Sequence, residues 1–264
     1  MPTEAVFIIP KVENFLWRIE HNQVREGGFA LITGDPGTGK SGVLRLLAER
    51  LERLREVTVG VLTHPQSNLA DFYREMGDIF GVGLKPNNRW GGFKALRERW
   101  QAHLENTLLR PVLLIDEAQE LSPAVLSELR VASGARFNSR LLLSLVLAGD
   151  GRLPDKLRRE DLLPSGSRIR TRLVMEYATR DEPLACLHHL LATAGNANLM
   201  TPDLMHTLCD HALGNYRVIT TLAAELLTAA AQREATQLDE KLYLEVFSPP
   251  NTSASNTRRT QRQR

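Results

Sequence analysis

The sequence predicts an α/β fold with a parallel sheet of about five strands and a C-terminal helical domain. Short, almost wholly apolar runs recur through the first two thirds of the chain, and amphipathic helical patterns separate them. Apolar runs of this length are typical of parallel strands that helices cover on both faces. Beyond residue 180 the apolar residues recur only at helical spacing, which indicates an all-helical domain.

Five apolar runs are the expected strands, and they are residues 29–33, 57–62, 111–115, 141–147 and 173–177. Helix starts are indicated by Ser67 or Asn68 after the second run, and by Ser122-Pro123 after the third. A turn-rich loop, residues 81–92, is expected between two helices.

Changes in composition predict three segments. Residues 1–180 are expected to form the α/β domain, residues 181–247 a helical lid, and residues 248–264 a disordered basic tail. The tail contains four arginines and no acidic residue, namely Arg258, Arg259, Arg262 and Arg264.

Composition also narrows the class of protein. The chain has 33 Lys and Arg against 31 Asp and Glu, so the body without its tail is slightly acidic and any nucleic-acid contact must be a local patch. Two cysteines predict no disulfide framework. No apolar run approaches the ~20 residues of a membrane span, and the start lacks a signal-peptide pattern. We therefore expect a cytoplasmic protein without a membrane partner.

The most specific motif follows the first expected strand and precedes a helix. It reads Gly34-Asp35-Pro36-Gly37-Thr38-Gly39-Lys40-Ser41. This spacing, G-x-x-x-x-G-K-[ST], is typical of a loop whose backbone N–H groups bind phosphate oxygens. Lys40 would contact the β- and γ-phosphates, and the Ser41 hydroxyl would bind Mg²⁺. The alternative is a glycine-rich turn, which the strand–loop–helix context disfavours.

Two acidic residues follow the expected strand 111–115. Asp116 would hold Mg²⁺ through water, and Glu117 would polarise a water molecule for attack on the γ-phosphate. An acidic loop after a core strand is the alternative, but the phosphate loop upstream argues against it. A glutamate beside the aspartate favours hydrolysis of the nucleotide over its storage.

Other polar residues have the positions of a sensor and of arginines that reach a nucleotide. Asp150 follows the strand 141–147 and is the candidate γ-phosphate sensor, although an Asp-Gly turn is an alternative. Arg168, Arg170 and Arg172 would share one face of an extended segment. One of them, with Arg168 favoured, would enter a neighbouring subunit's site. The alternative is a solvated face of an edge strand, which fits at least one of the three. Arg217 begins a lid helix and could couple nucleotide state to domain rotation, or be an ordinary surface arginine.

Six potential metal ligands occur close together in the helical domain, namely Cys186, His188, His189, His206, Cys209 and His211. The i, i+2 pairs among them diverge on a helix and do not easily share one metal, whereas the i, i+3 pairs Cys186–His189 and His206–Cys209 could. We therefore interpret these residues as helix packing.

Together these motifs resemble the AAA+ ATPases, and the resemblance covers residues 5–247. Within that superfamily, residues 116–121 and 147–153 are similar to the branch that contains the secretion ATPase ExeA and the transposition regulators TniB and TnsC. ExeA-type proteins carry a membrane segment and a cell-wall-binding domain, so the chain length is more similar to TniB and the short TnsC proteins. The usual ExeA-like glutamine at the sensor position is Asp150 here.

The resemblance implies an ATP- and Mg²⁺-dependent homo-oligomer, a ring or filament, on double-stranded DNA. It would recruit a transposase to target DNA together with a target-selection protein. Candidate DNA contacts are Lys85, Arg89, Trp90, Lys94 and Gln66, which could equally be solvated surface residues. The alternatives are a nucleotide-switched adaptor that contacts only proteins, and an ExeA-like secretion ATPase without DNA binding.

Overall fold

A five-stranded parallel sheet forms the centre of the first part of the chain, which confirms the predicted fold class. The computed structural model describes residues 7–83, 88–135 and 140–248. The strand order is β2-β3-β6-β1-β7. The strands are β1 (Gly28–Gly34), β2 (Val59–Leu62), β3 (Val112–Ile115), β6 (Ser144–Gly149) and β7 (Ile169–Met175).

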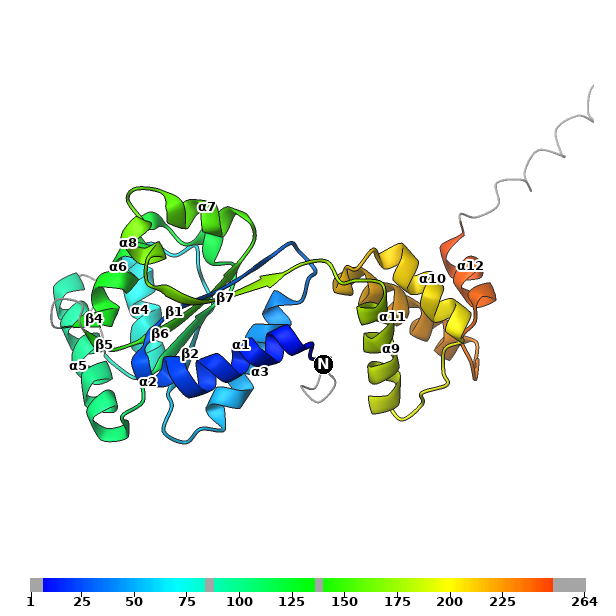
Figure 1. The fold of residues 1–264 in the computed structure, drawn as a ribbon, viewed down its shortest axis with the longest axis horizontal. Coiled ribbons are helices and arrows are strands. Elements are labelled where there is room, and N and C mark those ends of the chain that lie inside the picture. Colours follow the sequence, from blue (N-terminus) through cyan, green and yellow to red (C-terminus); the bar gives the residue numbers. More distant parts are fainter. Residues whose placement is uncertain (1–6, 84–87, 136–139, 249–264) are drawn as a thin grey trace, which may run out of the picture. The chain divides into compact units, whose positions relative to one another are not determined.

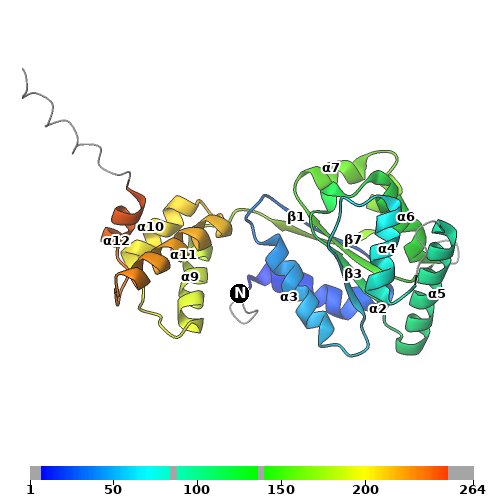
Figure 2. The ribbon, with the colours of Figure 1, turned by 180° about the vertical axis from the view of Figure 1, so that it is seen from behind.

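Helices cover both faces of this sheet (Figure 1; seen from behind in Figure 2). Ala30 and Ile32 of β1 pack with α1 and α3, whereas Phe29 and Leu31 pack with α4 to α7 on the other face. This follows from the alternation of side chains along a strand. The helices are α1 (Pro10–Arg18), α2 (Val24–Glu26), α3 (Lys40–Glu52), α4 (Leu69–Phe80), α5 (Arg89–Thr107), α6 (Pro123–Ser133), α7 (Arg152–Arg158) and α8 (Leu163–Gly166).

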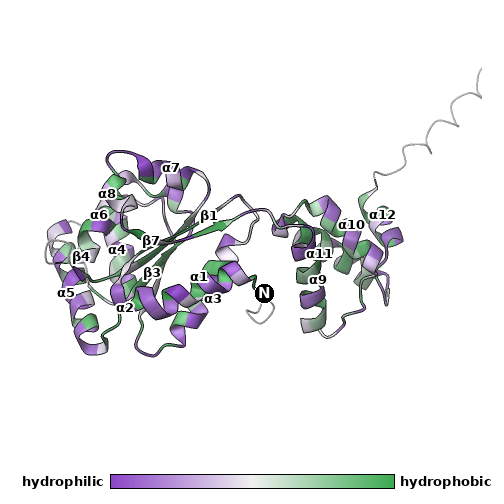
Figure 3. Ribbon diagram, in the orientation of Figure 1, coloured by the Kyte–Doolittle hydropathy of each residue, from purple (hydrophilic) through white to green (hydrophobic). Residues whose placement is uncertain are grey.

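The hydropathy of each element explains this layering. In Figure 3 the strands are mainly hydrophobic, and the covering helices carry both hydrophobic and hydrophilic residues. Helix starts follow the predicted capping residues: the Asn68 side chain accepts from two amides of α4, and Ser122 Oγ accepts from Val125 N at 3.3 Å. Because the caps satisfy first-turn amides, they determine where these helices begin.

Two predicted boundaries were wrong. Helix α5 begins inside the predicted loop 81–92, because Asn88 Oδ1 accepts from Gly91 N at 2.8 Å and caps the helix. The predicted strand 141–147 is two strands. Residues Arg140–Leu141 (β5) pair antiparallel with Gly134–Ala135 (β4), and β6 begins only at Ser144. The break cannot be recognised from the apolar run, because Leu142 and Leu143, which lie between the two strands, are buried as well.

The structure divides into two compact units, Met1–Tyr177 and Ala178–Arg264. The described part of the second unit is helical around a core of its own. Its helices are α9 (Asp181–Thr193), α10 (Pro202–Ala212), α11 (Tyr216–Gln232) and α12 (Glu240–Phe247). The predicted tail arginines, Arg258, Arg259, Arg262 and Arg264, lie outside the described residues.

The described residues contain neither a cluster of metal ligands nor a membrane-spanning helix. No three His, Cys, Asp or Glu side chains among them are grouped so that they could hold a metal ion. Within the described ranges, no helix has both the length and the apolar character that a membrane crossing requires.

Candidate nucleotide site

Three strands end at one edge of the sheet and bring the predicted motifs together. β6 lies between β3 and β1, and all three are parallel, so their carboxyl ends share an edge. The loop Gly34–Ser41 follows β1, Asp116 follows β3, and Asp150 follows β6. Ligands of open parallel sheets bind at this edge.

The glycines of the loop are required by backbone geometry. Gly37 and Gly39 have φ of 87° and 100°, in the left-handed region that side chains disfavour. Gly34 is required for a different reason: a Cβ there would lie 2.2 Å from Met175 O and 2.8 Å from Thr38 Oγ1. The loop conformation and the approach of β7 therefore both depend on glycine.

Polar atoms of the loop hold its lysine in place. Lys40 is 7% exposed, and its Nζ donates to Gly34 O at 2.8 Å and to Asp35 O at 3.0 Å. The Thr38 hydroxyl donates to Asp35 O at 2.8 Å. Ser41 lies in the first turn of α3, which begins without a side-chain cap. Uncapped first-turn amides favour an anion at a helix start.

These donor groups fit a nucleoside triphosphate with its magnesium ion. A buried ammonium group and a glycine-rich turn before an uncapped helix suit phosphate oxygens. The hydroxyl of Ser41 and the carboxylate of Asp116 would supply oxygen ligands of the kind that Mg²⁺ prefers.

Glu117 has an unusual backbone conformation and a defined hydrogen bond. Its φ of 49° places it in the left-handed region, where the chain turns after β3. Its amide donates to Asp116 Oδ1 at 2.9 Å, and its exposed carboxylate accepts from Gln119 Nε2. Strained backbone of this kind is frequent at functional sites.

Asp150 is engaged by its neighbours in the structure. Its carboxylate accepts from Arg152 N at 2.9 Å and lies 2.8 Å from Arg152 Nη2. The hydrogen bond from Arg152 lowers the pKa of Asp150, and the positive charge of Lys40 lowers it further. The Asp150 carboxylate is therefore held by Arg152 in the structure, and its role as a γ-phosphate sensor stays a prediction.

Gln119 belongs to this site and was not predicted. It lies in a short 3₁₀ turn, Ala118–Glu120, and is 7% exposed. Its amide nitrogen donates to Glu117, and its Oε1 accepts from Asp150 N at 3.2 Å. In the sequence, Gln119 could have been identified only by its position two residues after Glu117, within residues 116–121, which are similar to ExeA-type proteins.

The three arginines near β7 do not share one face. Arg168 precedes the strand, and its guanidinium donates to Arg130 O at 2.6 Å and Ser133 Oγ at 3.3 Å, while burial lowers its pKa. Arg170 pairs with Glu26 at 3.0 Å, and Arg172 is exposed. Arg168 lies before the strand, and the expected alternation is interrupted where the register of β7 against β1 shifts, between the pairs Phe29–Ile169 and Ala30–Thr171. Which arginine would reach a neighbour's site stays a prediction.

Arg217 lies in the second unit, in the first turn of α11. The Asn215 side chain caps this helix by accepting from Arg217 N at 3.0 Å and from Val218 N at 3.3 Å. The helix therefore begins where the sequence predicts, and the Arg217 residue is exposed. Its role toward a nucleotide stays a prediction.

Two of the cationic residues predicted to contact DNA, Arg89 and Lys94, are paired with acids. Arg89 forms an ion pair with the buried carboxylate of Glu128, which also accepts from the Tyr73 hydroxyl. Burial raises the pKa of Tyr73, and the bond to Glu128 raises it further. Lys94 Nζ lies 3.7 Å from Glu98 Oε1. Arg89 therefore neutralises a buried charge inside its own domain.

The aromatic and polar members of the predicted DNA surface are exposed. Trp90 is 74% exposed and stacks on Phe93 at a centroid distance of 5.8 Å. Gln66 is exposed in a turn between β2 and α4. Lys85 lies outside the described residues.

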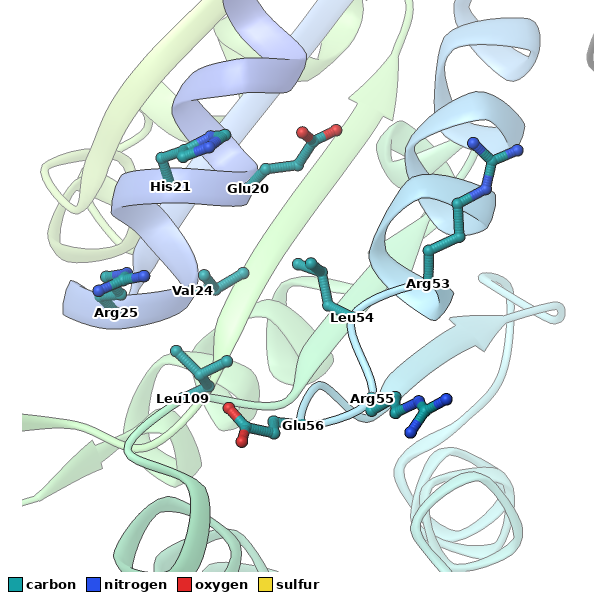
Figure 4. Close-up of a pocket in the computed structure, with 9 residues that line it drawn as sticks. All are labelled: Glu20, His21, Val24, Arg25, Arg53, Leu54, Arg55, Glu56 and Leu109. Atoms are coloured by element: carbon teal, nitrogen blue, oxygen red, sulfur yellow. The ribbon is translucent and has the colours of Figure 1, made fainter.

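A pocket of about 390 Å³ lies at the other end of α3, about 20 Å of helix away from the loop (Figure 4). In Figure 4 the side chains of Arg53 and Arg55 extend away from its apolar residues, so its charges do not converge on one point. This pocket is not the nucleotide site. Its lining residues are Glu20, His21, Val24, Arg25, Arg53, Leu54, Arg55, Glu56 and Leu109.

Known proteins resemble this chain in sequence and in fold. The chain is 31% identical over 211 residues to general secretion pathway protein A of Aeromonas hydrophila. The aligned residues make up 78% of this chain and 38% of that protein. Cdc6p from Pyrobaculum aerophilum has a similar fold, with a TM-score of 0.68, 19% identity and coverage of 90% of this chain and 66% of that one. The structure of the Aeropyrum pernix ORC1 protein in complex with DNA is also similar, with a TM-score of 0.66 and 19% identity. That match covers 93% of this chain and 67% of the ORC1 chain.

A protein family model described as AAA domain matches residues 23–157, which include the phosphate loop, Asp116, Glu117 and Asp150. Together with the parallel sheet and its strand-end motifs, this match shows that the chain belongs to the AAA family and has the fold of an AAA+ ATPase.

Proposed function

We propose that this chain binds ATP with Mg²⁺ at the loop Gly34–Ser41 and hydrolyses it to ADP and phosphate. The observation that supports the proposal is the meeting of β1, β3 and β6 at one edge of the sheet, which brings Lys40, Asp116 and Glu117 to a common site. Within this proposal the protein acts in the cytoplasm.

Each residue has a separate task in the proposed reaction. Lys40 and the loop amides hold the phosphates, and Ser41 and Asp116 hold Mg²⁺, which neutralises charge on the phosphate oxygens. Glu117 orients a water molecule and accepts its proton as the water oxygen attacks the γ-phosphorus. The bond to the β-phosphate oxygen breaks, and ADP leaves with the bonding electron pair. Asp150 would respond to the presence of the γ-phosphate.

We further propose that ATP drives assembly of a homo-oligomer, a ring or filament, on double-stranded DNA. An arginine from residues 168–172 would complete the site of a neighbouring subunit, and Arg217 would couple the lid to the nucleotide. The resemblance to TniB and TnsC supports a DNA partner, and so does the exposed Trp90 stack. Within this proposal the assembly recruits a transposase and a target-selection protein to target DNA.

The match to general secretion pathway protein A favours a second candidate, a secretion ATPase that acts on protein partners. The two candidate functions predict different responses of the ATPase activity to duplex DNA. The first candidate predicts that DNA raises the rate of phosphate release and moves the ATP-bound protein to faster sedimentation. Unchanged turnover and sedimentation with DNA would favour the secretion ATPase. A cell-based transposition assay with Glu117→Gln would then test the transposase partner, and unchanged insertion would exclude it.

A further inference from the structure

Gln119 is fixed at both ends of its side-chain amide. Its Oε1 accepts from Asp150 N at 3.2 Å, which leaves its Nε2 to donate to Glu117 Oε2. If the Gln119 amide were flipped, its NH₂ group would face the N–H of Asp150, and neither group could accept a hydrogen bond. The backbone N–H of Asp150 therefore determines the orientation of the side-chain amide. The buried glutamine therefore links the end of β6 to the carboxylate after β3.

The space that Gln119 occupies is kept open by a glycine. A Cβ at Gly149 would lie 2.4 Å from Gln119 Oε1 and 2.8 Å from Leu153 Cδ2. Gly149 is the last residue of β6 and has no φ in the left-handed region, so close approach rather than backbone conformation explains it. The glutamine side chain thus sits directly against the end of this strand.

The backbone around Gln119 is held as well. Lys156 Nζ, from α7, donates to Gln119 O at 2.6 Å and also to Leu121 O. Arg152 lies between two acids and contacts Glu120 and Asp150, each at 2.8 Å. The turn Ala118–Glu120 and the start of α7 are therefore joined by side chains from both, and Gln119 has little freedom to move.

The direction of this link matters for the reaction. Because β6 lies between β3 and β1, a bond from Glu117 toward the end of β6 holds its carboxylate on the side of the phosphate loop. We propose that Gln119 is a positioning residue for ATP hydrolysis, which fixes the Glu117 carboxylate through its bonds to Glu117 and Asp150. This inference rests on the proposed ATP hydrolysis.

Gln119→Met tests the proposal, because methionine has a similar length and shape but cannot donate to Glu117. We expect kcat to fall about 10- to 100-fold, while the Kd for Mg²⁺·ATP stays within about twofold of the parent value. Gln101→Met is the matched control. Gln101 donates to Glu105 at 2.9 Å on the exposed surface of α5, so its variant loses the same kind of bond away from the site and keeps the parent kcat.

Two further variants keep the test decisive. Gln119→Glu retains the acceptor for Asp150 N but turns a carboxylate oxygen toward Glu117, so kcat falls even if Gln119→Met does not fold. In a Glu117→Gln background, Gln119→Met should cause almost no additional loss of turnover, because a residue that acts through Glu117 is not additive with it. A purely structural residue would reduce turnover by the same factor in both backgrounds.

The outcomes separate this inference from the function on which it rests. A parent protein that releases no phosphate from ATP overturns the proposed hydrolysis itself. A parent that hydrolyses ATP, with Gln119→Met and Gln119→Glu both at parental kcat, overturns only the role of Gln119. An increase in KM without loss of kcat also overturns it, because the residue would then act on nucleotide binding.

Discussion

At Gly34, packing and loop geometry require the same residue for different reasons. The residue begins the phosphate loop and also lies against the backbone of β7, where Met175 O leaves no room for a Cβ. Sequence pattern identifies this glycine only through its place in the loop. The contact with β7 becomes visible only in the fold, because β7 lies far away along the chain.

Gly34→Ala should therefore be strongly destabilising. We expect the free energy of unfolding to fall by about 2–4 kcal/mol, since the carbonyl of Met175 is backbone and cannot rotate away. Gly42→Ala is the control in the same loop–helix segment. A Cβ there meets nothing within 4 Å, and alanine should stabilise α3 by about 0.5–1 kcal/mol. Denaturant unfolding measures both, and equal stability of the two variants would contradict the prediction.

Lys40 and Glu117 should have separable effects on the nucleotide. Lys40→Ala should weaken binding of Mg²⁺·ATP, because it removes the one buried ammonium group of the loop. Glu117→Gln should keep binding but lose about 100- to 1,000-fold in kcat and trap the assembled form. Calorimetric titration and phosphate release distinguish the two. A Glu117→Gln variant with parental turnover would exclude this residue as the base.

At the scale of elements, the C-terminus of α6 is held by two arginines from different parts of the chain. Arg97, from α5, donates to Val131 O and Ala132 O at 3.2 Å each, and Arg168 donates to Arg130 O. Cations are favourable at this end of a helix, where the last carbonyls have no partner within the helix. Arg168 therefore has a structural role whether or not it reaches a neighbouring subunit.

Arg168→Ala should lower the free energy of unfolding by about 1–2 kcal/mol, because it leaves Arg130 O without this donor. Arg172→Ala, on the exposed side of β7, should change stability by less than about 0.5 kcal/mol. Phosphate release at concentrations that permit assembly then shows which variant also loses activity. Loss of activity without loss of stability in Arg168→Ala would restore it as the first choice for the catalytic arginine.

The elements themselves were predictable where periodicity and caps agreed. Ser122-Pro123 begins α6 as expected, and the strand before Asp116 needed only its apolar run. The start of α5 was missed because Asn88 is a cap hidden in a stretch rich in turn residues. Gln119 was missed because its importance comes from the amide of Asp150, which only the pairing of β3 with β6 brings near. Partners that lie far apart along the chain cannot be identified from local pattern.

At the scale of the whole molecule, each unit has its own core, and the second contains both cysteines. Cys186 and Cys209 are buried, and burial raises the pKa of each thiol to about 11. An unfolded chain has thiol pKa values of about 8.5, so the folded unit retains protons that the unfolded one loses. The thiol contribution to stability is thus complete below about pH 8.5 and is lost as the pH rises toward 11.

Both thiols should therefore react slowly with a disulfide reagent at pH 8 and rapidly once the unit unfolds. Labelling across a urea series should follow the loss of helical circular dichroism. Raising the pH from 8 to 10 should shift labelling to lower urea concentrations. Complete labelling in native buffer within seconds would contradict the burial of these residues.

The place of β1 in the sheet also constrains synthesis of the chain. Both of its neighbours, β6 and β7, are translated long after it, and β7 supplies the carbonyl against which Gly34 packs. After the loop motif is complete, about 110 further residues must be synthesised before β6 can pair with β1, and about 130 before β7 can. The phosphate loop would therefore leave the ribosome well before its sheet is complete, and we expect the proposed ATP binding only once most of the first unit has been synthesised.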